Sequence, residues 1–242
     1  MNRRNLLRSG SAAGAALASM PASAQPGANG PARSLIEVRK ILFRNNRENK
    51  RAAYLAFLRN HYAPALKRAG VEAVGFFNND IGPDKPHVLC VLSYSSGNAL
   101  IDVREKLGAD SAFQAARKQV YGKGPVYERV ESSLLRAFSM TPKVEIPKAD
   151  APLYFELRTY ESDDPASLAA KIEMFEGGGE IALFRKYGLQ PVFFGQALIG
   201  DRMPNLTYMV AFPNPAARAE AWRKFATSPE WDKLKRTPGW SD

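Results

Sequence analysis

Apolar stretches of strand length alternate with longer segments of helical periodicity, and their order is the same in both halves of the chain. In the first half the predicted elements are a strand over 35–43, a helix over 47–69, strands over 72–77 and 88–94, and a helix over 97–107. In the second half they are a strand over 153–161, a helix over 165–187, strands over 190–198 and 207–212, and a helix over 215–226. Each half therefore predicts the order strand, helix, strand, strand, helix.

Helix caps and stops recur at a single offset of 118 residues, which indicates that the two halves are copies of one unit. The matched pairs are Asn46 and Asp164 as N-caps of the first helix, Gly70 and Gly188 as its stop, Gly82 and Gly200 in the hairpin, and Ser96 and Asn214 as N-caps of the second helix. The first helix of each copy is also interrupted, by Pro64 in one and by Gly177-Gly178-Gly179 in the other. We interpret the glycines as a hinge rather than a lid over a pocket.

Strands separated by helices, with a hairpin in the middle, are typical of a ferredoxin-like sheet with helices on one face. The other face of each sheet must be buried against another surface, and the two linked copies can bury these faces against each other without a partner chain. We therefore expect an α+β protein in which two tandem ferredoxin-like repeats pack sheet to sheet as an intrachain dimeric α/β barrel. The predicted parts are a signal peptide (1–24), a flexible lead-in (25–34), the first repeat (35–113), a crossing strand and linker (114–152), and the second repeat (153–236).

The first 24 residues have the pattern of an export signal. Arg3-Arg4 is followed by Leu6-Leu7, then by a weakly apolar run that ends at Ala22-Ser23-Ala24, a pattern that signal peptidase accepts. The paired arginines and the weak hydrophobicity favour the twin-arginine route over the Sec route. The apolar run is too short for about 30 Å of hydrocarbon, so we expect a periplasmic or secreted protein with no stable membrane insertion after cleavage.

Charge and cysteine content argue against some classes of function. The chain of 242 residues has 34 Lys and Arg against 24 Asp and Glu, for a net charge of +10. The positive charges are scattered, and the densest groups, 44–47 and 233–236, have acidic neighbours, so a solvated surface is favoured over a nucleic-acid site. The single cysteine, Cys90, excludes an internal disulfide and a cysteine-rich zinc site, and its apolar strand predicts a core position rather than a nucleophile.

Four segments of the second half carry a resemblance to a known family. They are Tyr154–Tyr160, Leu183–Val192, Arg218–Trp222 and Ser228–Trp231, and together they resemble a NIPSNAP domain. The first half is similar more loosely, since it keeps Glu37-Val38-Arg39 but has neither tryptophan. The resemblance implies a dimeric α/β-barrel fold, and it implies no catalytic residues. Eukaryotic members are mitochondrial and linked to vesicle traffic and mitophagy, and the export signal argues against those roles here.

Alternation along the strands selects the candidate ligand-binding residues. Glu156, Arg158 and Tyr160 share one face of their strand, and Glu37 and Arg39 hold matching places in the first repeat. With the apolar residues packed on the helices, these polar residues are expected to line the space between the sheets. They form either structural Glu–Arg bridges or a pocket for an anionic or carbonyl-bearing ligand, because arginine suits carboxylates and unpaired burial is costly. Glu156 is the candidate base if there is a reaction.

The sequence predicts no metal and no cofactor. Only two histidines occur, and His61, the one candidate metal ligand, has no second ligand at a suitable spacing. No phosphate-binding loop, metalloprotease motif or catalytic-triad pattern occurs.

Two classes of function are consistent with these features. The favoured class is a non-catalytic module that binds a small organic ligand or another protein, with a homodimer left open. The alternative is a cofactor-free monooxygenase- or isomerase-type enzyme that acts on a small acidic or enolisable compound in the inter-sheet pocket, an idea that rests on fold analogy alone.

Overall fold

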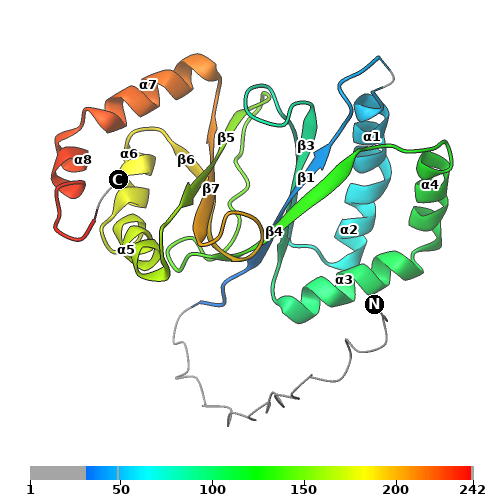
Figure 1. The fold of residues 1–242 in the computed structure, drawn as a ribbon, viewed down its shortest axis with the longest axis horizontal. Coiled ribbons are helices and arrows are strands. Elements are labelled where there is room, and N and C mark those ends of the chain that lie inside the picture. The colour runs from blue at the N-terminus through cyan, green and yellow to red at the C-terminus, as the bar shows by residue number, and fades with distance from the viewer. Residues whose placement is uncertain (1–30, 48, 241–242) are drawn as a thin grey trace, which may run out of the picture. The chain divides into compact units, whose positions relative to one another are not determined.

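The computed structural model describes residues 31–47 and 49–240, which form an α+β fold (Figure 1). The elements of the first half are β1 (Leu35–Leu42), α1 (Arg51–Phe57), the π-helix η1 (Leu58–Tyr62), α2 (Ala63–Ala69), β2 (Ala73–Asn78), β3 (His87–Tyr94), α3 (Gly97–Ala109), α4 (Ser111–Tyr121) and β4 (Arg129–Ala137). Those of the second half are β5 (Tyr154–Glu161), α5 (Pro165–Phe175), α6 (Glu180–Lys186), β6 (Gln190–Ile199), β7 (Asn205–Phe212), α7 (Pro215–Ala226) and α8 (Pro229–Leu234).

The described strands form one antiparallel sheet in the order β2-β3-β1-β4-β6-β7-β5. The first four have the order of a ferredoxin-like sheet, and the last three repeat its β2-β3-β1 part. The halves are joined where β4 pairs with β6, with Leu134 opposite Ile199 and Ala137 opposite Gly195. The predicted crossing strand is β4, and it links the two repeats.

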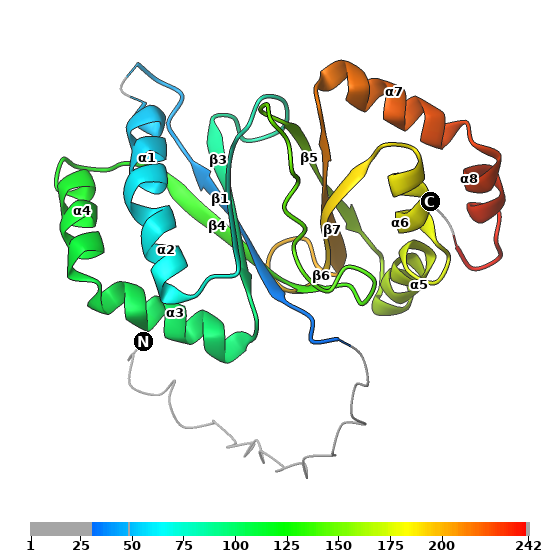
Figure 2. The same ribbon diagram turned by 180° about the vertical axis from the view of Figure 1, so that it is seen from behind.

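Helices cover the outer face of the sheet in each half, and the inner faces meet. Helices α1–α4 lie against the first-half strands and α5–α8 against the second-half strands, in both views (Figures 1 and 2). The rings of Phe77 in β2 and Phe155 in β5 are 4.7 Å apart, so the strands at the two ends of the order come together. The sheet therefore curls onto itself, and the expected intrachain barrel of two repeats is confirmed.

The apolar residues of the inner face form a core that both halves share. It includes Ile36, Leu89, Val91, Leu135 and Ala137 from the first half, and Val192, Phe193, Ala197, Met209 and Ala211 from the second. Each half has in addition its own core between strands and helices. Both faces of the sheet are therefore covered.

Most of the predicted caps are confirmed. Ser96, Asp164 and Asn214 each accept hydrogen bonds from backbone amides in the first turn of their helices. Gly70 ends α2 with a φ of 100°, in the left-handed region that favours glycine. The prediction of Asn46 as a cap is wrong, because the helix begins at Arg51 and the backbone amide of Arg51 bonds to the side chain of Asn49.

The interrupted first helix appears in both halves, in different forms. In the first half, α1 and α2 are joined by the five-residue π-helix η1, which ends just before Pro64. In the second half, the chain breaks between α5 and α6, and Gly179 has a φ of 86° there. No helix in the described ranges is both long and apolar enough to cross a membrane.

Candidate binding site

The five predicted pocket residues lie on the face of the sheet opposite to the one expected. Glu37 and Glu156 contact side chains of α3 and α7, so their face meets the helices. Phe155, which was expected to pack on helices, lies in the shared inner core. The expectation that these polar residues line the space between the sheets is therefore wrong, and apolar side chains fill that space instead. Both faces of this sheet are covered, so alternation alone could not indicate which face meets the helices.

In the first repeat, Glu37 accepts hydrogen bonds from four side chains. Its carboxylate is bonded by Ser132 Oγ at 2.8 Å, Arg39 Nη2 at 2.9 Å, Tyr94 Oη at 3.0 Å and Arg104 Nη2 at 3.5 Å. The side chain is only 4% exposed. Burial alone would raise the pKa of Glu37, but the Arg39 charge and the hydrogen bonds outweigh it, so the pKa lies below its ordinary value. Glu37 is a buried, fully engaged anion.

In the second repeat, Glu156 is bonded by three side chains. Arg218 donates from Nε at 2.7 Å and from Nη2 at 2.8 Å, Trp222 Nε1 donates at 2.7 Å, and Arg158 Nε donates at 2.8 Å. The Arg158 guanidinium also lies 3.8 Å from the centre of the Trp222 ring, and its Nη1 donates to Tyr160 Oη at 3.5 Å. All three predicted residues of this strand are therefore brought into one network that α7 completes.

The pKa of Glu156 is shifted away from the range of a useful base. Burial alone would raise it, but hydrogen bonds from Arg218, Trp222 and Arg158 outweigh burial and hold the pKa of this carboxyl below its ordinary value. A general base works best with a pKa near the operating pH. The geometry thus gives Glu156 the chemistry of a structural anion.

The helix residues Arg104, Arg218 and Trp222 were not predicted as partners of these glutamates, although Arg218–Trp222 is one of the segments that carry the family resemblance. A signal was present for two of them, because Arg104 and Trp222 are 118 residues apart and each donates to the glutamate of its own repeat. The offset used for the caps could therefore have paired them. The change from arginine to tryptophan shows that the position keeps a donor while its charge varies.

The other candidate residues are placed as follows. His61 is exposed on η1 with its ring beside Phe57. Within the residues that the structure describes, no group of three or more His, Cys, Asp or Glu side chains could hold a metal ion. Cys90 is a fully buried core residue, as predicted, and burial raises the pKa of its thiol to about 12, so it is not a thiolate at neutral pH.

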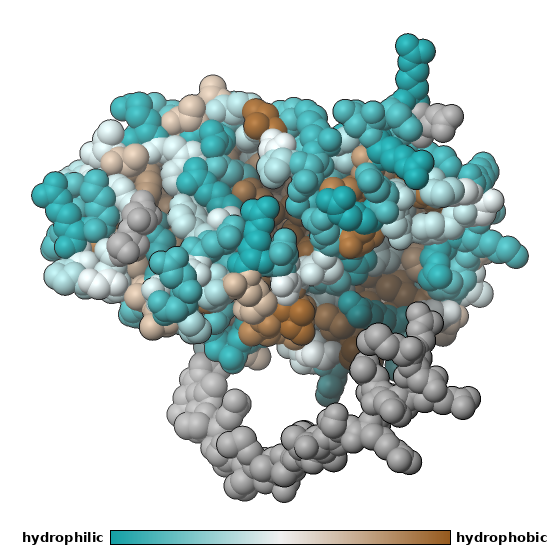
Figure 3. All heavy atoms as spheres, viewed as in Figure 1, coloured by the Kyte–Doolittle hydropathy of each residue, from teal (hydrophilic) through white to brown (hydrophobic). Residues whose placement is uncertain are grey.

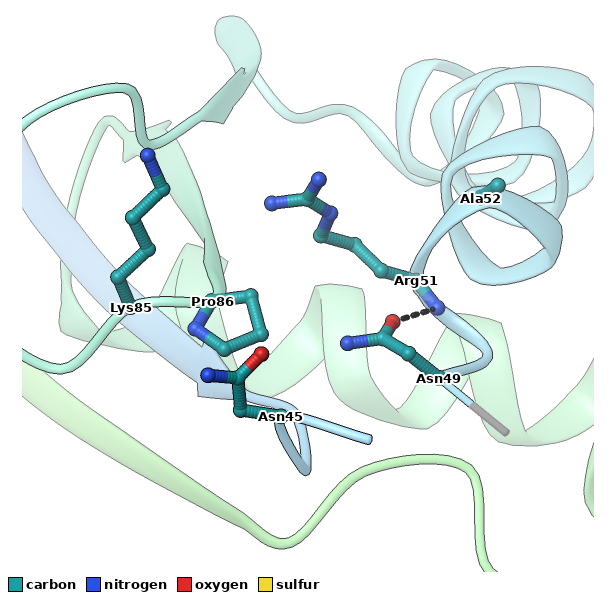
Figure 4. Close-up of a pocket in the computed structure, with 6 residues that line it drawn as sticks. All are labelled: Asn45, Asn49, Arg51, Ala52, Lys85 and Pro86. Carbon is teal, nitrogen blue, oxygen red and sulfur yellow. Dashed lines mark hydrogen bonds between the residues drawn. The ribbon is translucent and has the colours of Figure 1, made fainter. Parts of the chain in front are cut away.

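Two cavities occur near the start of α1, away from the predicted pocket residues. The larger has a volume of about 530 Å³ and is lined by Asn45, Asn49, Arg51, Ala52, Lys85 and Pro86 (Figure 4). The smaller, of about 140 Å³, is lined by Arg44, Asn46, Asn49, Lys50, Pro125, Val126 and Tyr127. Asn49 lines both cavities, and none of the five predicted pocket residues lines either. Both cavities have mixed polar and apolar linings, and their charged lining residues are all basic.

The repeated fold agrees with a family comparison. The NIPSNAP family model matches residues 45–142 and 155–238, one segment in each half. The chain belongs to the NIPSNAP family. No protein with a curated description matches it significantly.

Solved structures resemble this NIPSNAP chain in fold. A "putative monooxygenase" from Lactobacillus acidophilus is 13% identical, with 84% of this chain and 86% of that chain covered and a TM-score of 0.56. A second "putative monooxygenase", from Fusobacterium nucleatum, is also 13% identical, with coverages of 84% and 85% and a TM-score of 0.55. A NIPSNAP family protein from Agrobacterium tumefaciens is 24% identical, with coverages of 42% and 90% and a TM-score of 0.36. At these identities the likeness concerns the fold alone.

Proposed function

We propose that this NIPSNAP protein is a non-catalytic binding or interaction module. The observation that carries the proposal is the carboxylate of Glu156, which accepts four hydrogen bonds and has a lowered pKa. A carboxylate held in this way stabilises the packing of α7 on the sheet, and it is poorly suited to take a proton from a substrate. Glu37 has the corresponding role in the first repeat.

The enzyme alternative, a cofactor-free monooxygenase or isomerase, requires a reaction space between the sheets. Apolar side chains fill that space, among them Phe193 and Met209, which are 0% and 1% exposed. The fold likeness to proteins named as putative monooxygenases is compatible with this alternative but provides no reacting group. Binding is therefore the better supported class.

Turnover and binding can be separated on the purified protein. Oxygen uptake and enol–keto conversion are measured with an enolisable probe, acetylacetone, on the wild type and on Glu156→Gln. Native mass spectrometry of the same preparations identifies small molecules or proteins that co-purify. We expect no turnover with either protein. Turnover by the wild type that Glu156→Gln abolishes, while remaining folded, would establish the enzyme alternative.

The ion pairs themselves are tested by Arg158→Ala, with Arg39→Ala as its counterpart in the other repeat. The structural role requires a loss of unfolding free energy in both variants, because each leaves a buried carboxylate with fewer partners. A folded Arg158→Ala protein of unchanged stability that loses a co-purifying compound would instead make Arg158 a ligand-binding residue.

We further propose that the protein acts outside the cytoplasm after export by the twin-arginine route. Arg3-Arg4 and the small residues Ala22-Ser23-Ala24 support this, although they lie outside the described residues. A homodimer or another protein partner is compatible with the proposed role.

A further inference from the structure

The larger cavity near α1 is the strongest feature that the proposed function leaves unassigned. Two cationic side chains from distant parts of the chain line it, Arg51 at the start of α1 and Lys85 in the β2–β3 hairpin. Its volume of about 530 Å³ is within the usual range for small-molecule sites. We propose that this cavity binds a small molecule that carries a phosphate or carboxylate group. The proposal rests on the binding role above and names its ligand class.

The two cations that line the cavity have no acidic partner among the residues that the structure describes. In Figure 4 the Arg51 side chain extends from the start of its helix toward Lys85, and the Lys85 side chain rises from the hairpin on the opposite side of the space. Among the described residues, neither side chain forms an ion pair, and Lys85 Nζ donates to the backbone carbonyl of Asp80 at 2.5 Å. A carbonyl holds the ammonium in place but leaves its charge unbalanced. Two such charges on one cavity favour an anion there.

The loop that presents Arg51 is held by Asn49. Its Oδ1 accepts from the Arg51 backbone amide at 2.8 Å, and its Nδ2 donates to the Arg44 carbonyl at 2.8 Å. Both ends of the amide are therefore used to fix the loop. Asn45 completes the cavity with an exposed amide side chain (Figure 4). An arrangement fixed before binding loses less entropy when a ligand is bound.

The loop before α1 has a net positive charge, whereas the hairpin that supplies Lys85 also contains two acids, Asp80 and Asp84, of which Asp84 is paired with Lys40. Between positions 44 and 51 the sequence has four cations, Arg44, Arg47, Lys50 and Arg51, against the single acid Glu48. Lys50 is held much as Lys85 is, by donation to the Lys123 carbonyl at 3.0 Å. The local excess of positive charge would attract an anion over a distance of about a Debye length, about 10 Å at 0.1 M salt.

The second repeat shows that the fold does not need these residues. At the same offset of 118, Ala169 stands in the place of Arg51 and Met203 in the place of Lys85. The preceding loop contains Asp163 and Asp164 where the first repeat has Asn45 and Asn46. The corresponding helix and hairpin still form there. The cations at positions 51 and 85 are thus not required by the architecture.

Binding is tested by two-dimensional amide NMR with inorganic phosphate and, separately, citrate as probes at low ionic strength. We expect one or both to shift the amide signals of Asn45, Asn49, Arg51 and Lys85. Arg51→Ala and Lys85→Ala should each weaken binding by about tenfold, as loss of one charge-assisted hydrogen bond would. The probe that binds with the higher affinity, phosphate or citrate, indicates whether the ligand carries a phosphate or a carboxylate group.

Lys67→Ala is the matched control, because Lys67 is an exposed cation at the far end of α2. It should leave the affinity unchanged. Lys85 is exposed in a hairpin, so Lys85→Ala keeps the test valid if Arg51→Ala fails to fold. Absence of shifts, or equal weakening by Lys67→Ala, would overturn the proposal, and so would binding only to a single-stranded oligonucleotide. None of these outcomes alters the turnover assay, so failure here is distinct from failure of the proposed function.

Discussion

Glu37 and Glu156 occupy equivalent strand positions, and each has an arginine two residues later in its strand; Glu37 is buried and Glu156 is partly buried. The remaining donors differ between the repeats: Tyr94, Ser132 and Arg104 bond to Glu37, whereas Arg218 and Trp222 bond to Glu156. The same strand motif thus tolerates different surroundings as long as the carboxylate is fully hydrogen-bonded. This requirement follows from the cost of burying a charge without partners.

The lowered pKa of Glu37 predicts an acid dependence of stability. A carboxyl with a lower pKa in the folded state adds stability above its unfolded pKa of about 4.3. That stability is lost as the pH falls through the lower folded value. In Glu37→Gln this contribution is absent, so the free energy of unfolding in urea should be lower at pH 7. The gap between wild type and variant should shrink below about pH 4. A gap that stays constant down to pH 3 would contradict the prediction.

Trp222 is expected to stabilise the second repeat through its indole donor as well as through its ring. Trp222→Phe keeps an aromatic ring beside Arg158 but removes the Nε1 hydrogen bond to Glu156. A hydrogen bond to a charged group contributes about 1.5–3 kcal/mol, and we expect a loss of unfolding free energy of that size. A double-mutant cycle with Glu156→Gln measures the coupling between the two side chains. Additive losses would show that the bond contributes nothing.

At the scale of elements, the junction between β4 and β6 depends on close approach of the two backbones. An added Cβ at Gly195 would lie 2.9 Å from Leu135 Cβ and 3.3 Å from the Arg136 carbonyl oxygen. We expect Gly195→Ala to lower the free energy of unfolding by about 1–3 kcal/mol, since neither strand can shift freely. Gly108→Ala in α3 is the control, because nothing lies within 4 Å of its added Cβ. The control should be neutral or slightly stabilising, and equal losses in both variants would contradict the prediction.

Local signals predicted most elements, two helices were missed although each has a cap, and the orientation of one face of the sheet had no local signal. Periodicity and caps predicted α7 with its observed bounds, whereas α4 and α8 were not predicted. Their caps, Asp110 and Ser228, bond to the backbone amides of Phe113 and Trp231, so a local signal existed for both. The orientation of the Glu–Arg face had no local signal, because it depends on donors that other elements bring to the sheet. The site was therefore less predictable than the fold.

At the scale of the whole molecule, the surface seen in Figure 3 is mainly polar, with apolar residues in small groups. If export uses the twin-arginine route, replacement of both Arg3 and Arg4 by lysine should stop it. The measurement is the amount of protein in periplasmic fractions of cells that express each form. Lysine keeps the charge, so unchanged accumulation would favour the Sec route.

The core shared by the two inner faces should make the repeats unfold together. Phe193 is fully buried in this core, and Phe193→Ala should lower the free energy of unfolding by about 3–5 kcal/mol.

All three tryptophans lie in the second half, so their fluorescence reports on that half, whereas far-UV circular dichroism reports on both. In one cooperative unit the two signals change at the same urea concentration. Phe57→Ala, in the first-half core, should then shift the fluorescence midpoint although no tryptophan is in that half. A fluorescence midpoint that stays fixed in Phe57→Ala would mean that each repeat unfolds alone and that the shared core does not couple them.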